Sequence, residues 1–570
     1  MTNSSEQQDP TTVPAGAAGG PGPEGSGGPR RPRRRRLVRR VVLIVLGVLL
    51  LLVALAVTAY LWNNATARDR ERAAVEEAGF TERQATVDGH VLNYGEGPDN
   101  GPPLILVHGQ GSQWEDHALV LPELAERHHV FAVDVPGHGG SDRLPADRYS
   151  NVDVATLLAR FMEQQVGEPA TVSGHSSGGL LALWIAAERP ELVDGLLLED
   201  PPLFSSELPR LLQTTGGGLP TIAQEYLAND TGQPFQRYFV EQSDYFAFFG
   251  AAEQPIADYS LRWIDDHPDE PLRVFFLPPL VSIYFEGLVS YDPAFGAAWT
   301  EDTWYDGFDT EASLAAVDVP TTLIHTNYFE QARGSAYQDG VLMAAMDGAD
   351  VDRALGLLDD AELVQVASGH LVHYERAGVY LEAEQVLAGR VEAAPERPSV
   401  GERLEAAALD VFADRGLGER SRPIIEAQER LGTDEGDATW RAQGFPGAGV
   451  DAPLYSVQGS TDDVMATANL YELPVPRGAD PCEVPWDSHF SGERPCDVVD
   501  EGSDQQIVIV GYTNLREIYL IDESWVLNLN VNGTTVDGEL SDGPLPLTMQ
   551  EQRSALLTIA DEMRLRERTD

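Results

Sequence analysis

The feature that most constrains the fold is a strand, a tight turn and a helix in immediate succession at residues 170–190, "ATVSGHSSGGLLALWIAAERP". A short apolar run ends in Gly-His-Ser-Ser-Gly-Gly and continues at once as a helical pattern rich in Ala and Leu. The spacing G-x-S-x-G allows a turn too tight for side chains and leaves its middle serine exposed at the end of the strand. We therefore expect Ser176 to be a nucleophile. The alternatives are Ser177, which lacks a glycine two residues before it, or a turn that only needs small residues.

Apolar runs alternate with helical patterns from about residue 82 to 390. A hairpin is predicted by "RQATVDGHVLNYGEG", with its turn at Asp88-Gly89, and buried strands by "PLILVHG", "HVFAVDV", "PATVSGH" and "VDGLLLED". Continuous apolar strands between helices are typical of a parallel sheet covered on both faces. An aromatic-rich insertion of about 110 residues, at about 203–314, interrupts the pattern before "VDVPTTLIHT" and "AELVQVASGH" resume it.

A serine hydroxyl is a poor nucleophile and needs a base beside it. His370 in "SGHLVHYERAGVYL" follows an apolar strand, on a glycine-containing turn before a helix. The carboxyl ends of parallel strands share one edge of the sheet, so His370 and Ser176 are predicted to lie on the same edge. His373 is three residues further on, inside the first helical turn, and we interpret it as structural.

The oxyanion of an acyl-transfer reaction needs hydrogen-bond donors that are already in place. The glycine-rich turn "VHGQGSQW" follows a strand and offers the backbone N–H of Gln110. The N–H of Ser177, directly after the candidate nucleophile, is the second candidate donor. His108 is interpreted as a hydrogen-bonding residue of the turn.

Five segments resemble the α/β-hydrolase fold superfamily in order and spacing: "LILVHGQGS", "VFAVDVPGHGGSD", "VSGHSSGG", "LLLEDPP" and "SGHLVHYERA". The resemblance covers about residues 82–390 and is closest to capped serine hydrolases. It implies an α/β fold with a doubly wound, mostly parallel sheet and a helical cap at about 203–314. It also implies a Ser-His-acid triad with an oxyanion hole from Gln110 and Ser177. A serine at position 176 argues against epoxide hydrolases and haloalkane dehalogenases, which are similar but carry Asp there.

The acid departs from the common pattern. Many relatives place an Asp after the penultimate strand, but "TTLIHTNYFEQARG" has none in that place. An acid from a neighbouring strand can also orient the imidazole, because a triad is defined by geometry and not by chain position. We expect Asp200 to be the acid, then Glu199 beside it, then Glu330, with Asp339 further along. The residues in "LLLEDPP" can also be only a strand ending.

These residues predict a hydrolase that cleaves an ester-type bond of a small molecule, without a metal or organic cofactor. The aromatic insertion suggests an apolar acyl group, although such residues can simply form a core. The alternatives are a C–C bond hydrolase or a cofactor-free oxidoreductase on the same fold. A non-catalytic envelope protein that binds or signals is the alternative from another class.

The N-terminal region predicts a membrane anchor. Residues 41–62 are 22 residues without a charge, which as a helix reach about 33 Å, enough for a hydrocarbon core of about 30 Å. Eight arginines in residues 28–40 precede them, so residues 1–40 are expected to be a disordered basic tail in the cytoplasm. Residues 63–81 would form a stalk, and the rest would be extracytoplasmic. A cleaved signal peptide, with a site at "ATA" (65–67), is the alternative.

Beyond a linker at 391–404, residues 405–570 predict a second, extracytoplasmic α+β domain whose role and envelope partner the sequence leaves unknown. Its two apolar segments "QQIVIVGYTN" and "REIYLIDES" are predicted to be strands. Its Cys482 and Cys496 are expected to form a disulfide, since the exported side is oxidising. Two cysteines without a paired C-x-x-C do not indicate a metal site. The formal charge of -52, with no lysine, argues against a nucleic-acid partner.

Overall fold

The computed structural model describes a subset of the 570 residues. The described residues are 32–229, 232–394, 404, 406–411, 454–460, 464–471, 496–500, 506–512, 515–521, 526–533 and 549–562. Most of the predicted basic tail and linker, and Cys482, lie outside them. The chain divides into two compact units, Met1–Ala67 and Arg68–Asp570.

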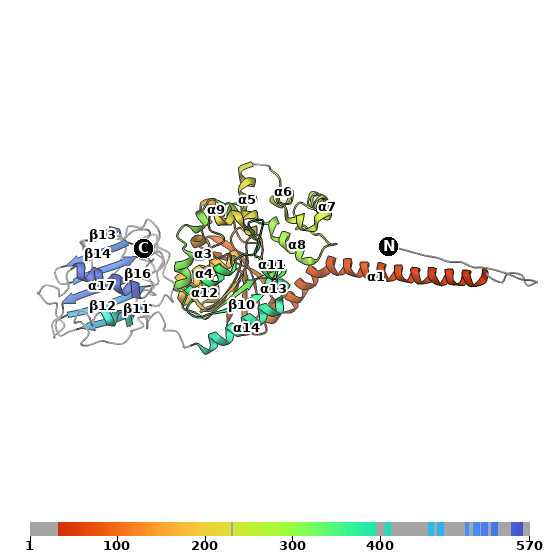
Figure 1. Ribbon diagram of the computed structural model, residues 1–570. Coiled ribbons are helices and arrows are strands. Elements are labelled where there is room, and N and C mark those ends of the chain that lie inside the picture. The colour runs from red at the N-terminus through yellow and green to blue at the C-terminus, as the bar shows by residue number, and fades with distance from the viewer. Residues whose placement is uncertain are drawn as a thin grey trace, which may run out of the picture. The chain divides into compact units, whose positions relative to one another are not determined.

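The described part of the first unit belongs to helix α1 (Pro32–Glu77), which is continuous (Figure 1). The apolar run predicted to span a membrane is helical throughout. By length and composition this helix can cross a membrane.

The second unit contains an eight-stranded sheet in the order β1-β2-β4-β3-β5-β6-β7-β10. Strands β4, β3, β5, β6, β7 and β10 run parallel to one another, β2 pairs antiparallel with β4, and β1 and β2 form the predicted antiparallel hairpin. Asp88 and Gly89 of its turn have φ values of 47° and 84°, as a two-residue hairpin turn requires. The strands are β1 (Thr81–Val87), β2 (His90–Glu96), β3 (Pro103–Val107), β4 (His129–Val133), β5 (Ala170–His175), β6 (Val193–Glu199), β7 (Thr321–Thr326) and β10 (Ala361–Val366).

Helices cover both faces of this sheet, which confirms the predicted α/β class. In β3, Leu104 and Leu106 pack into one buried cluster and Ile105 and Val107 into another, because successive side chains of a strand point to opposite faces. The strands read as unbroken apolar runs for this reason. The helices around the sheet are α2 (Leu121–Leu124), α3 (Asn151–Phe161), α4 (Ser177–Glu188), α12 (Gly348–Leu357), α13 (Val372–Glu375) and α14 (Ala377–Ala393).

The insertion between β6 and β7 is helical, as the predicted cap requires (Figure 1). Its aromatic residues pack mostly against one another: the rings of Trp299 and Trp304 stack at 4.3 Å between centroids, and those of Phe246 and Phe285 at 5.5 Å. Most of the aromatic residues that mark this segment in the sequence therefore form the hydrophobic core of the cap. The helices are α5 (Gly218–Asn229), α6 (Phe235–Gln242), α7 (Glu253–Asp266), α8 (Pro279–Glu286), α9 (Pro293–Thr300) and α10 (Thr310–Ala316).

The C-terminal region has its own six-stranded antiparallel sheet, ordered β11-β12-β16-β15-β14-β13, and a helix, α17 (Met549–Glu562). Of these strands, only β14 and β15 were predicted from the sequence. Cys496 begins β13, and because Cys482 is not described the disulfide stays a prediction. The strands are β11 (Leu454–Ser460), β12 (Val464–Tyr471), β13 (Cys496–Asp500), β14 (Gln506–Tyr512), β15 (Leu515–Ile521) and β16 (Val526–Gly533).

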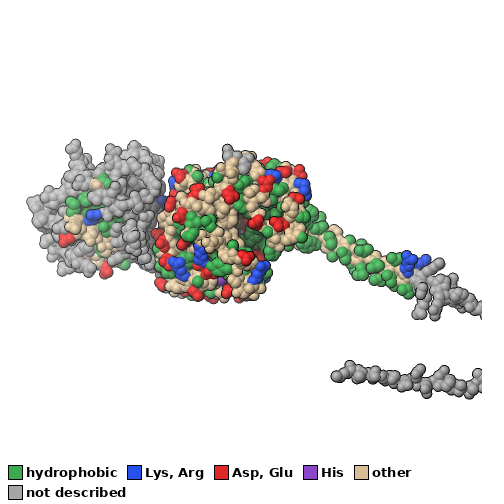
Figure 2. Space-filling model, turned by 45° about the horizontal axis from the view of Figure 1, so that its top comes forward, with side chains coloured by type: hydrophobic (Ala, Val, Ile, Leu, Met, Phe, Trp, Pro, Cys, Tyr) green, Lys and Arg blue, Asp and Glu red, His purple; other side chains and the backbone are tan. Residues whose placement is uncertain are grey.

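Acidic side chains are spread over the visible surface of the α/β domain, among fewer arginines (Figure 2). This distribution fits the strongly negative formal charge of the chain.

Candidate active site

Ser176 lies in the turn between β5 and α4, with φ 54° and ψ −122°. A serine rarely adopts a positive φ, and such strain concentrates at functional sites. The turn depends on its glycines. A Cβ on Gly178 would lie 2.4 Å from the carbonyl oxygen of Val107, and a Cβ on Gly174 would lie 2.3 Å from that of Gly178. The motif therefore brings helix α4 close to the ends of the strands and leaves Ser176 partly exposed.

His370 and Asp200 are hydrogen-bonded, with His370 Nδ1 2.7 Å from Asp200 Oδ2. Asp200 directly follows β6, is fully buried and has φ 45°. Its carboxylate also accepts from the backbone N–H of Thr326 at 3.0 Å and from the Thr326 hydroxyl at 2.8 Å. Three donors thus fix the carboxylate, which in turn holds the His370 ring with Nδ1 protonated.

Glu199, the neighbouring candidate acid, contacts a different histidine. It accepts from the backbone N–H of His373 at 2.8 Å and from His373 Nδ1 at 2.9 Å. His373 is buried, and its ring stacks on that of His117 at 4.4 Å between centroids. The two adjacent acids of "LLLEDPP" therefore pair with two histidines that are three residues apart.

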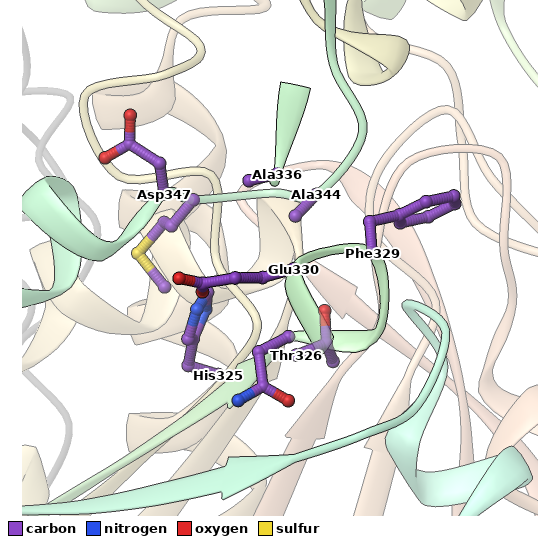
Figure 3. A pocket seen from close by; sticks show the side chains of 9 residues that line it. His325, Thr326, Phe329, Glu330, Ala336, Ala344 and Asp347 are labelled. Atoms are coloured by element: carbon purple, nitrogen blue, oxygen red, sulfur yellow. The ribbon is translucent and has the colours of Figure 1, made fainter. Parts of the chain in front are cut away.

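The other two acids lie elsewhere. Glu330, on α11 (Tyr328–Arg333), lines a small pocket with His325 and other side chains (Figure 3). Asp339 is exposed, in the turn between β8 (Tyr337–Gln338) and β9 (Val341–Leu342).

His175 connects the turn of Ser176 to that of His370. Its Nε2–H donates to the backbone oxygen of His370 at 3.1 Å, and the two rings lie 4.6 Å apart between centroids. The strand ends that carry Ser176, Asp200 and His370 are thus brought together at one edge of the sheet. Neither His175 nor Thr326 was predicted from the sequence, because His175 occupies a variable position of G-x-S-x-G and Thr326 belongs to no motif.

The two predicted oxyanion donors lie on the turns expected for them. Ser177 is the first residue of α4, and the first N–H groups of a helix have no acceptor within the helix. Gln110 lies in the turn after β3, which two buried histidines hold. His108 Nδ1–H donates to Gly109 O at 2.8 Å, and His138 Nε2 accepts from Gly111 N–H at 3.1 Å.

Electrostatics distinguish His370 from His175, the residue that precedes Ser176. Burial alone would lower the pKa of His370, but the hydrogen bond and negative charge of Asp200 raise it above its ordinary value. Burial and the neighbouring His370 lower the pKa of His175 well below the ordinary value. Of the two rings, only His370 is suited to take up a proton near neutral pH. No group of three His, Cys, Asp or Glu suited to a metal ion occurs in the described part of the chain.

The family model described as "alpha/beta hydrolase fold" matches residues 102–377, the segment that holds all of these groups. Residues 102–377 belong to the α/β-hydrolase family. Within this family, the chain is 28% identical to a soluble epoxide hydrolase of Corynebacterium sp. (strain C12), over 32% of this chain and 66% of that protein. It is 42% identical to a pimeloyl-[acyl-carrier protein] methyl ester esterase of Chromobacterium violaceum, over 17% of this chain and 36% of that protein.

A solved membrane phospholipase A is also similar, with a TM-score of 0.38 and 24% identity over 62% of this chain and 100% of that one. The chain spans between 29% and 66% of the length of these curated relatives. It covers 39% of a magnesium-chelatase 30 kDa subunit of Rhodobacter capsulatus, for example, at 34% identity over 20% of this chain.

Proposed function

We propose that the chain is a serine hydrolase that cleaves an ester-type bond. The observation that carries the proposal is the hydrogen bond of 2.7 Å between His370 and the buried Asp200, beside a serine on a strained turn. In this proposal Asp200 takes the role of the acid, and Glu199 and Glu330 do not.

The reaction follows from these positions. Ser176 Oγ attacks the acyl carbon while His370 Nε2 takes its proton. The N–H groups of Gln110 and Ser177 stabilise the oxyanion, and the dipole of α4 favours negative charge at its N-terminus. His370 then protonates the leaving alcohol, and a water that it activates releases the acid. Asp200 holds the imidazole in the tautomer that keeps Nε2 free.

The cap favours a substrate with an apolar acyl group. A Cβ on Gly111, next to the donor Gln110, would lie 3.0 Å from a methyl carbon of Leu219 and 3.5 Å from one of Leu288. Both leucines come from the cap, so the oxyanion turn is covered by hydrocarbon. Such a surface gains free energy by burying an alkyl or aryl chain.

A C–C bond hydrolase is the second candidate. The chain is 35% identical, over 22% of its length, to a 2-hydroxymuconate semialdehyde hydrolase of Pseudomonas sp. (strain CF600), and covers 45% of that protein. We favour an ester as the substrate. A serine nucleophile and the apolar side chains of the cap are enough for an ester, and they require no further functional group on the substrate. The long apolar part of α1 supports a single-pass anchor. The eight arginines before it favour an extracytoplasmic hydrolase domain.

The test is a substrate panel on the full-length chain in detergent micelles: aryl esters of increasing acyl length, a vinylogous 1,5-diketone and an epoxide. We expect turnover of esters with a preference for longer acyl chains, and a loss of at least about 10³-fold in Ser176→Ala. Turnover of the diketone alone would favour the C–C hydrolase. Ester turnover that survives in Ser176→Ala would contradict the proposal.

A further inference from the structure

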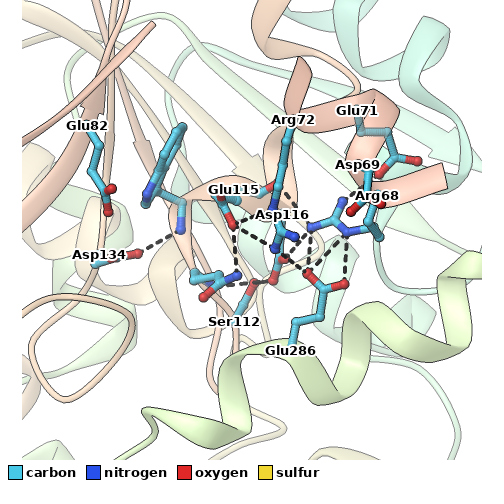
Figure 4. A network of polar contacts seen from close by, with 12 residues as sticks. Arg68, Asp69, Glu71, Arg72, Glu82, Ser112, Glu115, Asp116, Asp134 and Glu286 are labelled. Atoms are coloured by element: carbon cyan, nitrogen blue, oxygen red, sulfur yellow. Dashed lines mark hydrogen bonds and ion pairs between the residues drawn. The ribbon is translucent and has the colours of Figure 1, made fainter. Parts of the chain in front are cut away.

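The helical segment that follows the predicted membrane span contains a buried arginine, Arg68, with 7% of its surface exposed (Figure 4). Its Nε and Nη2 donate to the carboxylate of Glu286 at 3.0 Å each. Nη1 donates to Glu71 at 2.6 Å, and Nη2 also reaches Asp116 at 3.2 Å. One guanidinium group thus binds Glu71 on its own helix and two carboxylates from other parts of the α/β unit, and through Glu71 it reaches a third part.

The first of these parts is the cap. Glu286 ends helix α8, and the next residue, Gly287, packs on the oxyanion turn. A Cβ on Gly287 would lie 2.3 Å from the carbonyl oxygen of Gly111 and 2.9 Å from that of Ser112. Arg68 therefore holds the cap at the residue next to its contact with this turn.

The second part is the oxyanion turn. Asp116 accepts hydrogen bonds from the Ser112 hydroxyl and, at 3.2 Å, from the backbone N–H of Gln113. Ser112 N–H in turn donates to Gly109 O at 3.2 Å, which closes the turn around Gln110. A continuous set of contacts leads from Arg68 to the backbone that carries a proposed oxyanion donor.

The third part is the segment of the proposed base. Glu71 accepts from the hydroxyl of Tyr374 at 3.0 Å, and the Arg68 guanidinium lies 5.9 Å from the centre of the Tyr374 ring. Tyr374 lies on α13, four residues after His370.

The charges explain why the arginine is needed. Glu286 and Asp116 each have side chains only 3% exposed, and a buried carboxylate is costly unless it is paired. Burial raises the pKa of Asp116 to about 7, although Arg68 acts to lower it. Arg72 supplies a second cation, 2.9 Å from Glu115 and 3.3 Å from Glu286.

We propose that Arg68 is a positioning residue for the reaction, which holds the oxyanion turn, cap helix α8 and the His370 segment in their reactive arrangement. Arg68 lies near the start of the predicted stalk (63–81). This part of the stalk then belongs to the catalytic domain and does not act only as a spacer. This inference rests on the proposed function, because its effect is read through Ser176.

The test compares full-length variants by the rate of labelling with a fluorophosphonate, by kcat and KM for an aryl ester, and by the melting temperature. A misplacement of about 1 Å can cost about 10²-fold in rate, so we expect Arg68→Ala to label about 10²-fold more slowly. We expect kcat to fall with the labelling rate and KM to change less than about threefold. Arg68→Lys keeps the charge but loses the planar fork, and should recover about tenfold.

Two matched variants make the result specific. Arg148→Ala removes an exposed arginine that pairs with Asp153 at 2.7 Å, and should label like wild type. Tyr374→Phe removes only the hydroxyl that Glu71 accepts, and should slow labelling severalfold without loss of the fold. If Arg68→Ala does not fold, Arg68→Lys and Tyr374→Phe decide the question.

Wild-type labelling rates in folded Arg68→Ala, or in both Arg68→Lys and Tyr374→Phe, would overturn the inference. Slower labelling with a raised KM and an unchanged kcat would do so as well, since that pattern indicates weaker binding only. Failure of the wild-type chain itself to label would instead contradict the proposed function, so the two failures are distinguishable.

Discussion

The substitution Asp200→Asn removes the charge that orients His370 and keeps the shape of the side chain. Asp200 Oδ1 can still accept from Thr326 N–H, but the amide nitrogen at the Oδ2 position becomes a donor to His370 Nδ1. The imidazole must then carry its proton on Nε2, which can no longer take the proton of Ser176. A tautomer error of this kind costs about 10⁴-fold in kcat, which at 1.36 kcal/mol per tenfold is about 5.5 kcal/mol of barrier.

Fluorophosphonate labelling and aryl-ester turnover of the purified variant measure this loss, and the melting temperature checks that the fold is kept. Glu199→Gln is the matched control, because it changes the adjacent acid and its contact with His373 only. We expect that control to lose about 1–3 kcal/mol of stability, since a buried partner is lost, but less than about tenfold in rate. If Asp200→Asn keeps more than about a tenth of the wild-type rate, or if Glu330→Gln loses as much, the assignment of the acid is refuted.

The remaining predictions concern pH and packing. His370 acts as a base only when neutral, and Asp200 raises its pKa, so kcat/KM should fall as the pH falls through a value above the ordinary histidine pKa of about 6.5. The acid limb should move to lower pH in Asp200→Asn, and a profile that is the same in both proteins would contradict this. Gly178→Ala places a Cβ 2.4 Å from Val107 O, so we expect it to abolish labelling and lower the melting temperature, whereas Gly348→Ala, with open space around it, should do neither. Tyr149→Phe removes a buried hydroxyl that donates to Asp292 at 2.8 Å and accepts from Leu144 N–H at 2.9 Å, and should lower stability by about 1–3 kcal/mol in a denaturant titration.

The sequence predicted the sheet and the place of the insertion because both leave local patterns, whereas the helical character of the insertion followed from the family resemblance. Strands buried on both faces are apolar without interruption, and the turn at Ser176 needs glycines at fixed positions. The aromatic residues of the segment at about 203–314 marked an insertion but did not predict the bounds of its helices. Four strands of the C-terminal sheet were missed for a related reason, since β12 and β16 mix apolar residues with Asn, Thr and Gly.

The site was predictable in so far as its residues lie at strand ends. Ser176, His370 and Asp200 all do, whereas the choice between Asp200 and Glu199 depends on which way each side chain points. That direction follows from the alternation along β6 and from the turn after it, and adjacent residues of a sequence do not reveal it. Arg68 could not be identified, because its partners are distant in the chain: Asp116 and Glu286 lie 48 and 218 residues away.

The site of a covalent adduct shows directly whether Ser176 is the nucleophile. The full-length protein is labelled with a fluorophosphonate, digested, and its modified residue located by mass spectrometry. We predict one adduct, on Ser176, that is absent from Ser176→Ala and slowed in Asp200→Asn. An adduct on Ser177 or another serine, or no adduct on the folded protein, would contradict the account.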